Sequence, residues 1–543
     1  MAARAGRAPA AGRTPMSRRL ALTLALTLLV LFACSRGEDS RNSSSAQPAS
    51  PPAQPAGPSL DAALADLDAY IPKKMAQWKI PGAACAVVKD GAVVFAKGYG
   101  VKKAGGNEAV DADTVFQVGS TSKAFTAAQM AQLVEEGRLA WTDPVRRHFP
   151  GFAMHDPWVS ENFLVADLMA QRSGLPEHAG DMMILLGYTP EEYLRALRFF
   201  KPATSFRSAF AYQNGLFLAA GEIIRAKTGR PWAENVAERI FKPLGMTSAS
   251  ATLAGFEASA NRARPHFGTP EGPAPIPDDW PLRGWAYTMG PAGGINSSVN
   301  DMAKWVACMA GGGSLGQTRI LKPESLAFLH APSIHSPLPL KRTLGFTSSY
   351  CQGWVSTGYQ AGPVVWHTGG TSGMSCVVAF LPSRNLGLVW LTNLGDNPFT
   401  YPVPFHFFDT YLGLQGPDLE AYVEDKARAT RQAAETHGLN CRPKEFPALG
   451  LPAYAGTYAN EALGNCEVVE AGGSLRLLTG AARMSTELRP CGRDSFEMLI
   501  GMPGPGPLVQ FLPGPDGHVQ AMRLEVFEIE GVDLLQRVQP PNK

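Results

Sequence analysis

The sequence predicts an α+β chain followed by a small all-β domain. Two apolar, strand-like runs near the beginning of the fold flank the turn Lys89-Asp90-Gly91. Asp-Gly between such runs is a strong hairpin signal. A mostly helical stretch then continues to about Gly245, and residues 362–391 return to strand-like runs with tight connections. From residue 453 onward, short runs alternate with Gly and Pro turns, which is typical of a small β-sandwich or barrel.

Residues 1–34 are predicted to be a targeting segment. Arg18 and Arg19 precede the uncharged apolar run 20–33, which is too short to span a bilayer comfortably and suits a signal peptide. The run ends at Cys34 in a sequence that resembles a bacterial lipobox, so we expect a protein exported to the periplasm and held to the membrane by lipid on Cys34. Phe32 is bulkier than that position usually carries, which leaves plain secretion as the alternative.

Residues 35–58 are rich in Ser, Pro, Ala and Gln and contain few apolar residues. Such a segment cannot bury enough surface to fold, so it is predicted to be a disordered tether.

The composition excludes several classes of function. The formal net charge of +2 gives no reason to expect a nucleic-acid partner. The chain contains no Gly-x-x-x-x-Gly-Lys, His-Glu-x-x-His or Cys-x-x-Cys motif, so no cofactor and no metal are predicted. Seven cysteines follow Cys34, and their odd number and wide spacing do not fit a disulfide framework. A single disulfide bridge among them is left open.

The elements are expected in the following order. A helix covers roughly residues 60–78, and the hairpin strands cover 82–88 and 92–98. A helix beginning near Ser120 should end at Gly137, where a C-cap glycine belongs. Further helices are predicted at 216–227 and 299–310. Strand-like runs at 362–367, 374–381 and 386–391 are interpreted as an antiparallel meander.

The segment Gly312-Gly313-Ser314-Leu315-Gly316 matches the Gly-x-Ser-x-Gly pattern of a nucleophile elbow. That elbow needs a strand before it and a helix after it, whereas here a helix precedes it. We interpret it as a glycine-rich helix end.

The C-terminal part is divided into a connector, residues 416–452 with a polar helix, and an all-β domain, residues 453–543. No catalytic constellation is visible in the latter.

Ser120 and Lys123 are the candidates for nucleophilic chemistry. They are three residues apart at the start of a predicted helix and therefore share a face. A serine hydroxyl needs a neighbour to take its proton, and a desolvated lysine can do so because burial disfavours the charged form. The four-residue pattern alone also fits an ordinary N-cap serine with a surface lysine.

Two further segments carry polar groups that can join this pair. Tyr212 and Asn214 are two residues apart before a helix, so on an extended piece their side chains point the same way. His367, Thr368 and Gly369 end the first strand of the meander.

In this order, the three segments resemble the motifs of the β-lactamase-related serine hydrolases, which include class C β-lactamases, penicillin-binding proteins, esterases and D-aminopeptidases. The resemblance covers residues 59–415 and extends to further recurrent segments, which are 116–126, 172–176, 243–247, 291–294 and 378–382. It implies an antiparallel sheet flanked by helices, with an all-helical lobe and a cleft between them. The last domain resembles a lipocalin-like module.

The resemblance also implies the roles of the residues. Ser120 attacks a carbonyl and forms an acyl-enzyme, while Lys123 and Tyr212 move protons. Which of the two is the base is left open by the sequence. The backbone N–H groups of Ser120 and Gly370 form the oxyanion hole, and Asn214 positions the substrate or these groups.

His367, Thr368 and Gly369 are expected to bind substrate. The family typically carries lysine at the position of His367, where it helps bind a substrate carboxylate. Histidine is mostly neutral at pH 7, so strong penicillin recognition is not expected and other esters or peptides are favoured.

We therefore expect an exported hydrolase that cleaves an ester or amide bond in a small molecule or peptide, and that meets the membrane through its lipid anchor alone. Two alternatives remain. One is a non-catalytic cell-envelope binding protein of the same fold, and the other is an acyltransferase that uses the same acyl-enzyme.

Overall fold

The structure is a computed structural model that describes residues 57–336, 347–416, 418–438 and 447–539. The expected signal peptide, the lipid site Cys34 and most of the tether lie outside these residues. Within them, no helix combines the length and the apolar character needed to cross a bilayer.

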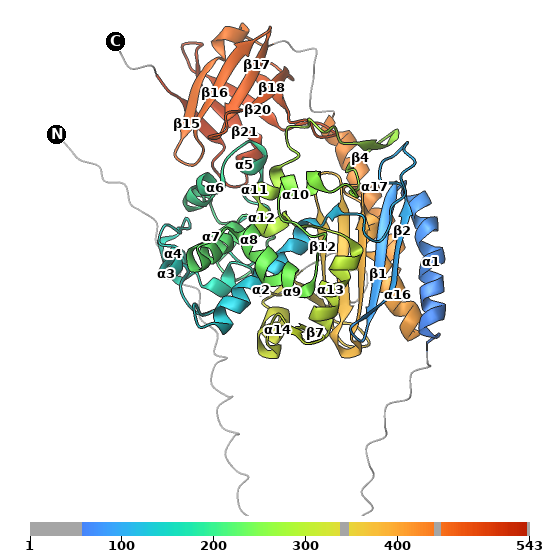
Figure 1. The fold of residues 1–543 in the computed structure, drawn as a ribbon. Coiled ribbons are helices and arrows are strands. Elements are labelled where there is room, and N and C mark those ends of the chain that lie inside the picture. The colour runs from blue at the N-terminus through green and yellow to red at the C-terminus, as the bar shows by residue number, and fades with distance from the viewer. Residues whose placement is uncertain (1–56, 337–346, 417, 439–446, 540–543) are drawn as a thin grey trace, which may run out of the picture. The chain divides into compact units, whose positions relative to one another are not determined.

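An antiparallel sheet of eight strands forms the centre of the fold (Figure 1). Its order is β2-β1-β14-β13-β12-β11-β10-β9. The strands are β1 (Gly82–Lys89), β2 (Ala92–Gly100), β9 (Ile334–Ser336), β10 (Ser348–Tyr350), β11 (Val355–Thr357), β12 (Val364–Gly370), β13 (Ser375–Leu381) and β14 (Leu386–Thr392).

The predicted hairpin and meander are both confirmed. Lys89 pairs with Ala92, and the two residues between them, Asp90 and Gly91, both have positive φ, as a tight hairpin turn requires. The meander β12-β13-β14 joins the hairpin because β14 pairs with β1. The three short strands β9, β10 and β11, which extend the sheet beyond β12, were not predicted.

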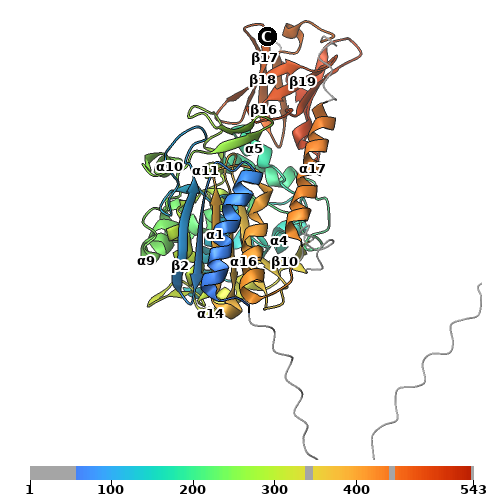
Figure 2. The ribbon, with the colours of Figure 1, turned by 90° about the vertical axis from the view of Figure 1, so that its right-hand side faces the viewer.

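Alternate residues of β1 belong to two different hydrophobic cores, as the two-residue period of a strand dictates. Cys85 and Val87 pack in the core under α1 (Leu60–Gln77) and α16 (Pro402–Leu412), which lie side by side over the sheet in Figure 2. Ala84 and Ala86 face the opposite core, to which α13 (Val299–Ala310) belongs.

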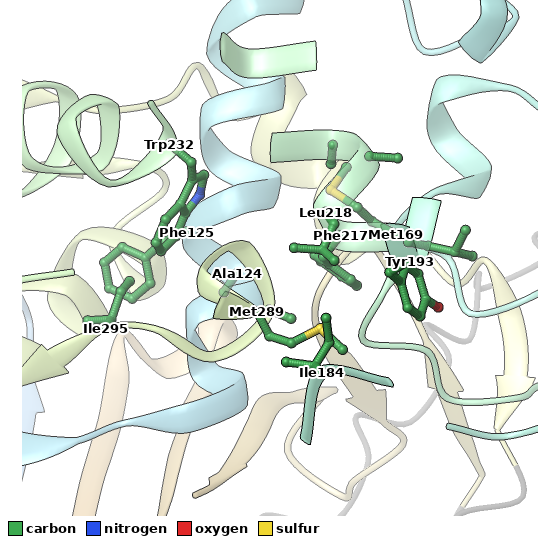
Figure 3. Close-up of a cluster of buried hydrophobic side chains, with 14 of the residues drawn as sticks. Ala124, Phe125, Met169, Ile184, Tyr193, Phe217, Leu218, Trp232, Met289 and Ile295 are labelled. Carbon is green, nitrogen blue, oxygen red and sulfur yellow. The ribbon is translucent and has the colours of Figure 1, made fainter. Parts of the chain in front are cut away.

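The helical lobe contributes to that second core, whose centre is α2 (Ser122–Glu135). Figure 3 shows Ala124 and Phe125 of α2 among apolar side chains of the neighbouring helices, including Phe217 and Trp232. Phe125 also stacks on Trp305 of α13, with ring centroids 4.1 Å apart. A helix buried on nearly all sides cannot easily shift, which fixes the residues at its N-terminus.

The remaining elements of this part of the chain are short. The helices are α3 (Val145–His148), α4 (Pro157–Asn162), α5 (Asp181–Leu185), α6 (Pro190–Ala196), α7 (Leu216–Thr228), α8 (Trp232–Val236), α9 (Lys242–Leu244), α10 (Leu253–Ala258), α11 (Trp285–Thr288), α12 (Gly290–Gly293) and α14 (Pro323–His330). The 3₁₀-helical turns are η1 (Gly119–Thr121), η2 (Val165–Asp167), η3 (Leu197–Phe199), η5 (Pro382–Arg384) and η6 (Pro398–Thr400), and η4 (Ala237–Phe241) is a π-helical turn. The small strand pairs are β3 (Phe116–Gln117) with β6 (Asn296–Ser297), β4 (His266–Thr269) with β5 (Gly272–Pro275), and β7 (Ser314–Leu315) with β8 (Thr318–Arg319).

The glycine-rich segment at residues 312–316 is a helix end, as predicted. Helix α13 stops at Ala310. Gly312 and Gly313, between the helix and strand β7, and Gly316, in the hairpin turn after it, all have positive φ. Ser314 lies in strand β7 rather than at a strand-to-helix turn.

Helix α17 (Leu419–Gly438) lies where the polar connector helix was predicted. It precedes a closed barrel, which decides between the sandwich and barrel alternatives. The barrel strands are β15 (Gly456–Asn460), β16 (Gly464–Ala471), β17 (Ser474–Thr479), β18 (Met484–Pro490), β19 (Ser495–Leu499), β20 (Leu508–Pro513), β21 (Val519–Leu524) and β22 (Leu534–Arg537), accompanied by the turns η7 (Leu451–Ala453) and η8 (Glu525–Phe527). β22 returns to pair with β15 and closes the barrel.

The cysteines behave mainly as small hydrophobic residues. Five are free and buried, at positions 85, 308, 351, 376 and 466, whereas Cys491 is in a disulfide.

Candidate active site

Ser120 lies in the turn η1, between strand β3 and helix α2. Gly119 before it has a φ of +48°, and a Cβ added there would lie 2.6 Å from the backbone nitrogen of Gly370. Only glycine therefore allows the end of β12 to approach the turn that carries Ser120 this closely. Ser120 and Gly370 both line a cleft of about 750 Å³.

Lys123 is fully buried one turn below Ser120. Its Nζ lies 3.0 Å from Ser120 Oγ, 2.6 Å from Asn214 Oδ1 and 3.0 Å from the carbonyl oxygen of Ala292. A lysine ammonium has three N–H donors, so these three acceptors satisfy it completely. Burial nevertheless lowers the pKa of Lys123 to about 7, against a smaller raising effect from the carboxylate of Asp181.

The three partners of Lys123 differ in what they can do when the amine is neutral. Neutral lysine has two donors and one lone pair, and that lone pair must face a donor. The oxygens of Asn214 and Ala292 can only accept, whereas the hydroxyl of Ser120 can also donate. The geometry therefore directs the lone pair of neutral Lys123 at the proton of Ser120.

Tyr212 faces the same pair. Lys123 Nζ lies 4.8 Å from the centre of its ring, and the rings of His178, Tyr350 and His367 surround it. Burial raises the pKa of Tyr212 well above its ordinary value, and this outweighs the opposite effect of its hydrogen bond with Ser120. The phenol is therefore protonated at neutral pH.

Asn214 is held in a defined orientation. Its Nδ2 donates to Asp181 Oδ2 over 2.6 Å, and its Oδ1 accepts from Lys123. Because a carboxylate only accepts and an ammonium only donates, the flipped amide would be unfavourable on both sides.

The sequence reasoning missed Asp181 and His178. Besides Asn214, Asp181 Oδ2 contacts Nδ1 of His178 at 2.8 Å, and this hydrogen bond raises the pKa of His178. Both residues line the cleft. They lie between the recognised motifs, and the sequence carries no pattern there that distinguishes them from surface residues.

Gly370, the last residue of β12, carries the backbone N–H that was predicted to be the second oxyanion donor. Thr371 donates its N–H to the carbonyl of Met374 over 2.9 Å, which makes this pair a hydrogen-bonded one. In an antiparallel ladder the next pair, Gly370 with Ser375, is then non-hydrogen-bonded, so the N–H of Gly370 points away from β13. On that side β11 pairs with β12 only as far as Trp366, so among the described residues no strand pairs with Gly370 there.

His367 is buried, with 3% of its surface exposed, and it lines the cleft. Its Nε2 lies 3.0 Å from the hydroxyl of Tyr350, and its Nδ1 lies 2.5 Å from the carbonyl oxygen of Thr368. Since a carbonyl only accepts, Nδ1 carries the proton and Nε2 accepts from Tyr350. Burial, with a further contribution from Lys123, lowers the pKa of His367 to about 3. The ring is therefore neutral at ordinary pH.

Thr368 also lines the cleft, whereas Gly369 packs behind it. A Cβ added at Gly369 would lie 2.0 Å from the carbonyl oxygen of Val118. Gly369 thus lets β12 lie directly against the segment that carries Ser120, and its part in binding substrate stays a prediction. In the described residues, no cluster of His, Cys, Asp and Glu side chains has the arrangement of a metal site.

The chain that carries this cleft is similar to known proteins in sequence and in fold. A model of the beta-lactamase family matches residues 67–405. The chain is 28% identical over 416 residues to the unguisins hydrolase ungD′ of Aspergillus campestris (strain IBT 28561), an alignment that covers 72% of each chain. It is 24% identical over 334 residues to the protein flp of Staphylococcus aureus (strain COL), covering 61% of this chain and 63% of that one.

Among solved structures, the octameric penicillin-binding protein homologue from Pyrococcus abyssi superimposes with a TM-score of 0.59 at 22% identity. The match covers 85% of this chain and 98% of that one. At this identity the likeness concerns the fold alone.

Proposed function

The chain belongs to the β-lactamase family, and from this premise we propose that it is a serine hydrolase that cleaves an ester or amide through an acyl-Ser120 intermediate. The observation that carries the proposal is the buried Lys123, with a pKa of about 7 and its lone pair directed at Ser120. The unguisins hydrolases among the relatives support hydrolysis as the overall reaction.

In acylation, neutral Lys123 takes the proton of Ser120 while Oγ attacks the carbonyl carbon of the substrate. The carbonyl electron pair moves to oxygen, where the N–H groups of Ser120 and Gly370 stabilise it. The intermediate collapses, the acyl group stays on Ser120, and the leaving alcohol or amine takes a proton from the hydroxyl of Tyr212. Tyr212 regains its proton from the ammonium of Lys123.

In deacylation, a water molecule replaces the leaving group. It attacks the acyl carbon, gives its proton to the same pair of residues and releases the acid, while the proton returns to Ser120. Lys123 is the base in this scheme because its pKa is near neutrality, whereas that of Tyr212 is well above its ordinary value.

The function is tested with a panel of p-nitrophenyl acetate, a D-alanyl p-nitroanilide and a cephalosporin, with product analysis at increasing concentrations of a competing amine. Turnover of at least one substrate to the free acid is expected. Exclusive formation of the amide product would instead identify an acyltransferase. Binding of all three without turnover would contradict the proposal and favour a non-catalytic binding protein.

The pH dependence should report Lys123. A base is active when it is unprotonated, so we expect kcat/KM for a neutral ester to rise tenfold per pH unit below about pH 7 and to level off above it. Steady-state assays from pH 5 to pH 9 check this. A profile that falls with rising pH over the same range would contradict Lys123 as the base.

The charges of the cleft favour substrates without a carboxylate near the reacting carbon. Three carboxylates, Glu177, Asp181 and Asp396, line the cleft against two basic groups, Lys426 and His178, and His367 is neutral. We therefore expect mono-p-nitrophenyl succinate to be hydrolysed roughly tenfold less efficiently than p-nitrophenyl butyrate, which has the same chain length without the charge. Each kcat/KM is divided by the rate constant for hydrolysis of the same ester by hydroxide without enzyme, which corrects for the different intrinsic reactivity of the two esters. Equal or higher efficiency for the succinate would refute a cleft that disfavours carboxylates.

A further inference from the structure

Helix α5 carries Asp181 at its first position and supplies Leu185 to the cleft, yet it has only five residues. A helix this short is not stable on its own, so its place is set by what it contacts. Figures 1 and 2 both show α5 next to the C-terminal barrel.

The barrel contacts the beginning of α5 through Glu530, a carboxylate that is 3% exposed. Glu530 Oε1 accepts the backbone N–H of Gly180, directly before Asp181, over 2.9 Å. The backbone carbonyl of Glu530 also accepts the N–H of Lys201 over 2.9 Å, so the loop that carries Glu530 is itself tied to the helical lobe.

The barrel also contacts the end of α5. The hydroxyl of Thr479 donates to the carbonyl oxygen of Leu186 over 2.7 Å. The adjacent Gly480 lies so close to Gly187 that an added Cβ would be 2.4 Å from the carbonyl oxygen of Gly187. The hydroxyl of Tyr188 reaches the barrel as well, donating to the carbonyl of Leu463 over 3.1 Å. Both ends of the helix are therefore anchored to the barrel.

A continuous series of contacts leads from this anchor to the nucleophile. Glu530 fixes Gly180, the next residue Asp181 orients the amide of Asn214, and Asn214 accepts from Lys123 beside Ser120. We propose that the C-terminal barrel is a working part of the active site, in which Glu530 is a positioning residue that holds Asp181, and through it Asn214 and Lys123, in the catalytic arrangement. This inference rests on the proposed function.

The chemistry of Glu530 predicts which substitutions matter. Glutamine keeps an oxygen that can accept from Gly180 and preserves the size of the side chain, whereas alanine leaves the buried N–H of Gly180 without its acceptor. When Asp181 is displaced, Lys123 loses a nearby negative charge that raises its pKa. The part of the pH profile in which kcat/KM rises with pH, below about pH 7, is the acid limb. It should then move to lower pH, an effect that a general loss of stability does not produce.

The experiment compares Glu530→Ala, Glu530→Gln and Asp181→Asn with the wild type, using the full chain. The matched control is Tyr454→Phe, which removes a hydroxyl whose hydrogen bonds are with Leu449, Arg493 and Asp494 rather than with α5 or the residues next to it. We expect Glu530→Ala to lower kcat/KM for p-nitrophenyl acetate about tenfold and to move the acid limb in the same direction as Asp181→Asn. Glu530→Gln and Tyr454→Phe should keep the wild-type profile. An unchanged limb in Glu530→Ala, or equal effects of Glu530→Ala and Tyr454→Phe, would overturn the inference.

Hydrogen–deuterium exchange over residues 180–186 separates this inference from the proposed function. Faster exchange is expected in Glu530→Ala, and in Thr479→Val if the alanine variant does not fold, but not in Tyr454→Phe. If the wild type turns over none of the three substrates of the panel yet this exchange pattern appears, the anchoring holds and the hydrolase proposal fails. Unchanged exchange in both variants would refute the anchoring whatever the enzyme does.

Discussion

Replacing Ser120 by alanine should abolish acylation and lower kcat/KM for p-nitrophenyl acetate by about 10⁴-fold or more. The expected loss is this large because Ser120 provides the atom to which the acyl group is attached, so its removal leaves no covalent route at all, whereas loss of a base only slows that route. What activity remains would come from binding and from the oxyanion donors. The measurement is steady-state hydrolysis, together with labelling by a serine-reactive fluorophosphonate.

The chain provides its own control for this prediction. Ser314 lies in the Gly-x-Ser-x-Gly segment that matches a nucleophile elbow in letters but forms a helix end and a short hairpin. Ser314→Ala should retain full labelling and activity. Loss of labelling in Ser314→Ala, with labelling kept in Ser120→Ala, would show that the wrong serine was assigned.

Replacing Lys123 by methionine should lower kcat/KM by about 10²- to 10⁴-fold, the range that a positioned general base contributes. Methionine is similar in length and suits a fully buried position. The variant should also lose the acid limb near pH 7, because the group that titrates there is gone. Steady-state assays across pH test both effects, and the melting temperature is measured in parallel to show that the variant is folded.

Tyr212→Phe distinguishes the two candidate bases. It keeps Lys123, so the acid limb should persist although proton delivery to the leaving group is impaired. If Tyr212→Phe removed the acid limb and Lys123→Met kept it, Tyr212 would be the base and the assignment made here would be reversed.

The sequence predicted those parts of the fold that depend on local pattern. The turn at Asp90 and Gly91 requires a positive φ at both positions, and few residue pairs tolerate this conformation as readily as Asp-Gly does. The helix at residues 299–310 and the meander strands are likewise set by their own periodicity. In contrast, strands β9, β10 and β11 have three residues each and are recognisable only by their pairing with neighbours.

The residues of the candidate site fall into the same two groups: those that lie in a local sequence pattern, and those recognisable only by their contacts. Ser120, Lys123, Tyr212, Asn214 and His367 were predicted because they lie in recurring motifs. Four of them line one cleft, and Lys123 is buried beside Ser120. Asp181 has no motif, and its importance comes from a contact with a residue 33 positions away in the chain.

The contact between Glu530 and Gly180 spans 350 positions, which no local pattern can indicate. Our proposal of Lys123 rather than Tyr212 as the base also rests on the structure, because it depends on the burial of each group and on what each one contacts.

The most direct test of the central claim is intact-protein mass spectrometry during turnover, with residues 59–543 mixed with p-nitrophenyl acetate and quenched rapidly. We expect a mass increase of one acyl group, mapped by peptide analysis to Ser120, that decays as substrate is consumed and is absent from Ser120→Ala. Hydrolysis that proceeds at the same rate in Ser120→Ala, or an acyl group that maps to another residue during turnover, would contradict it.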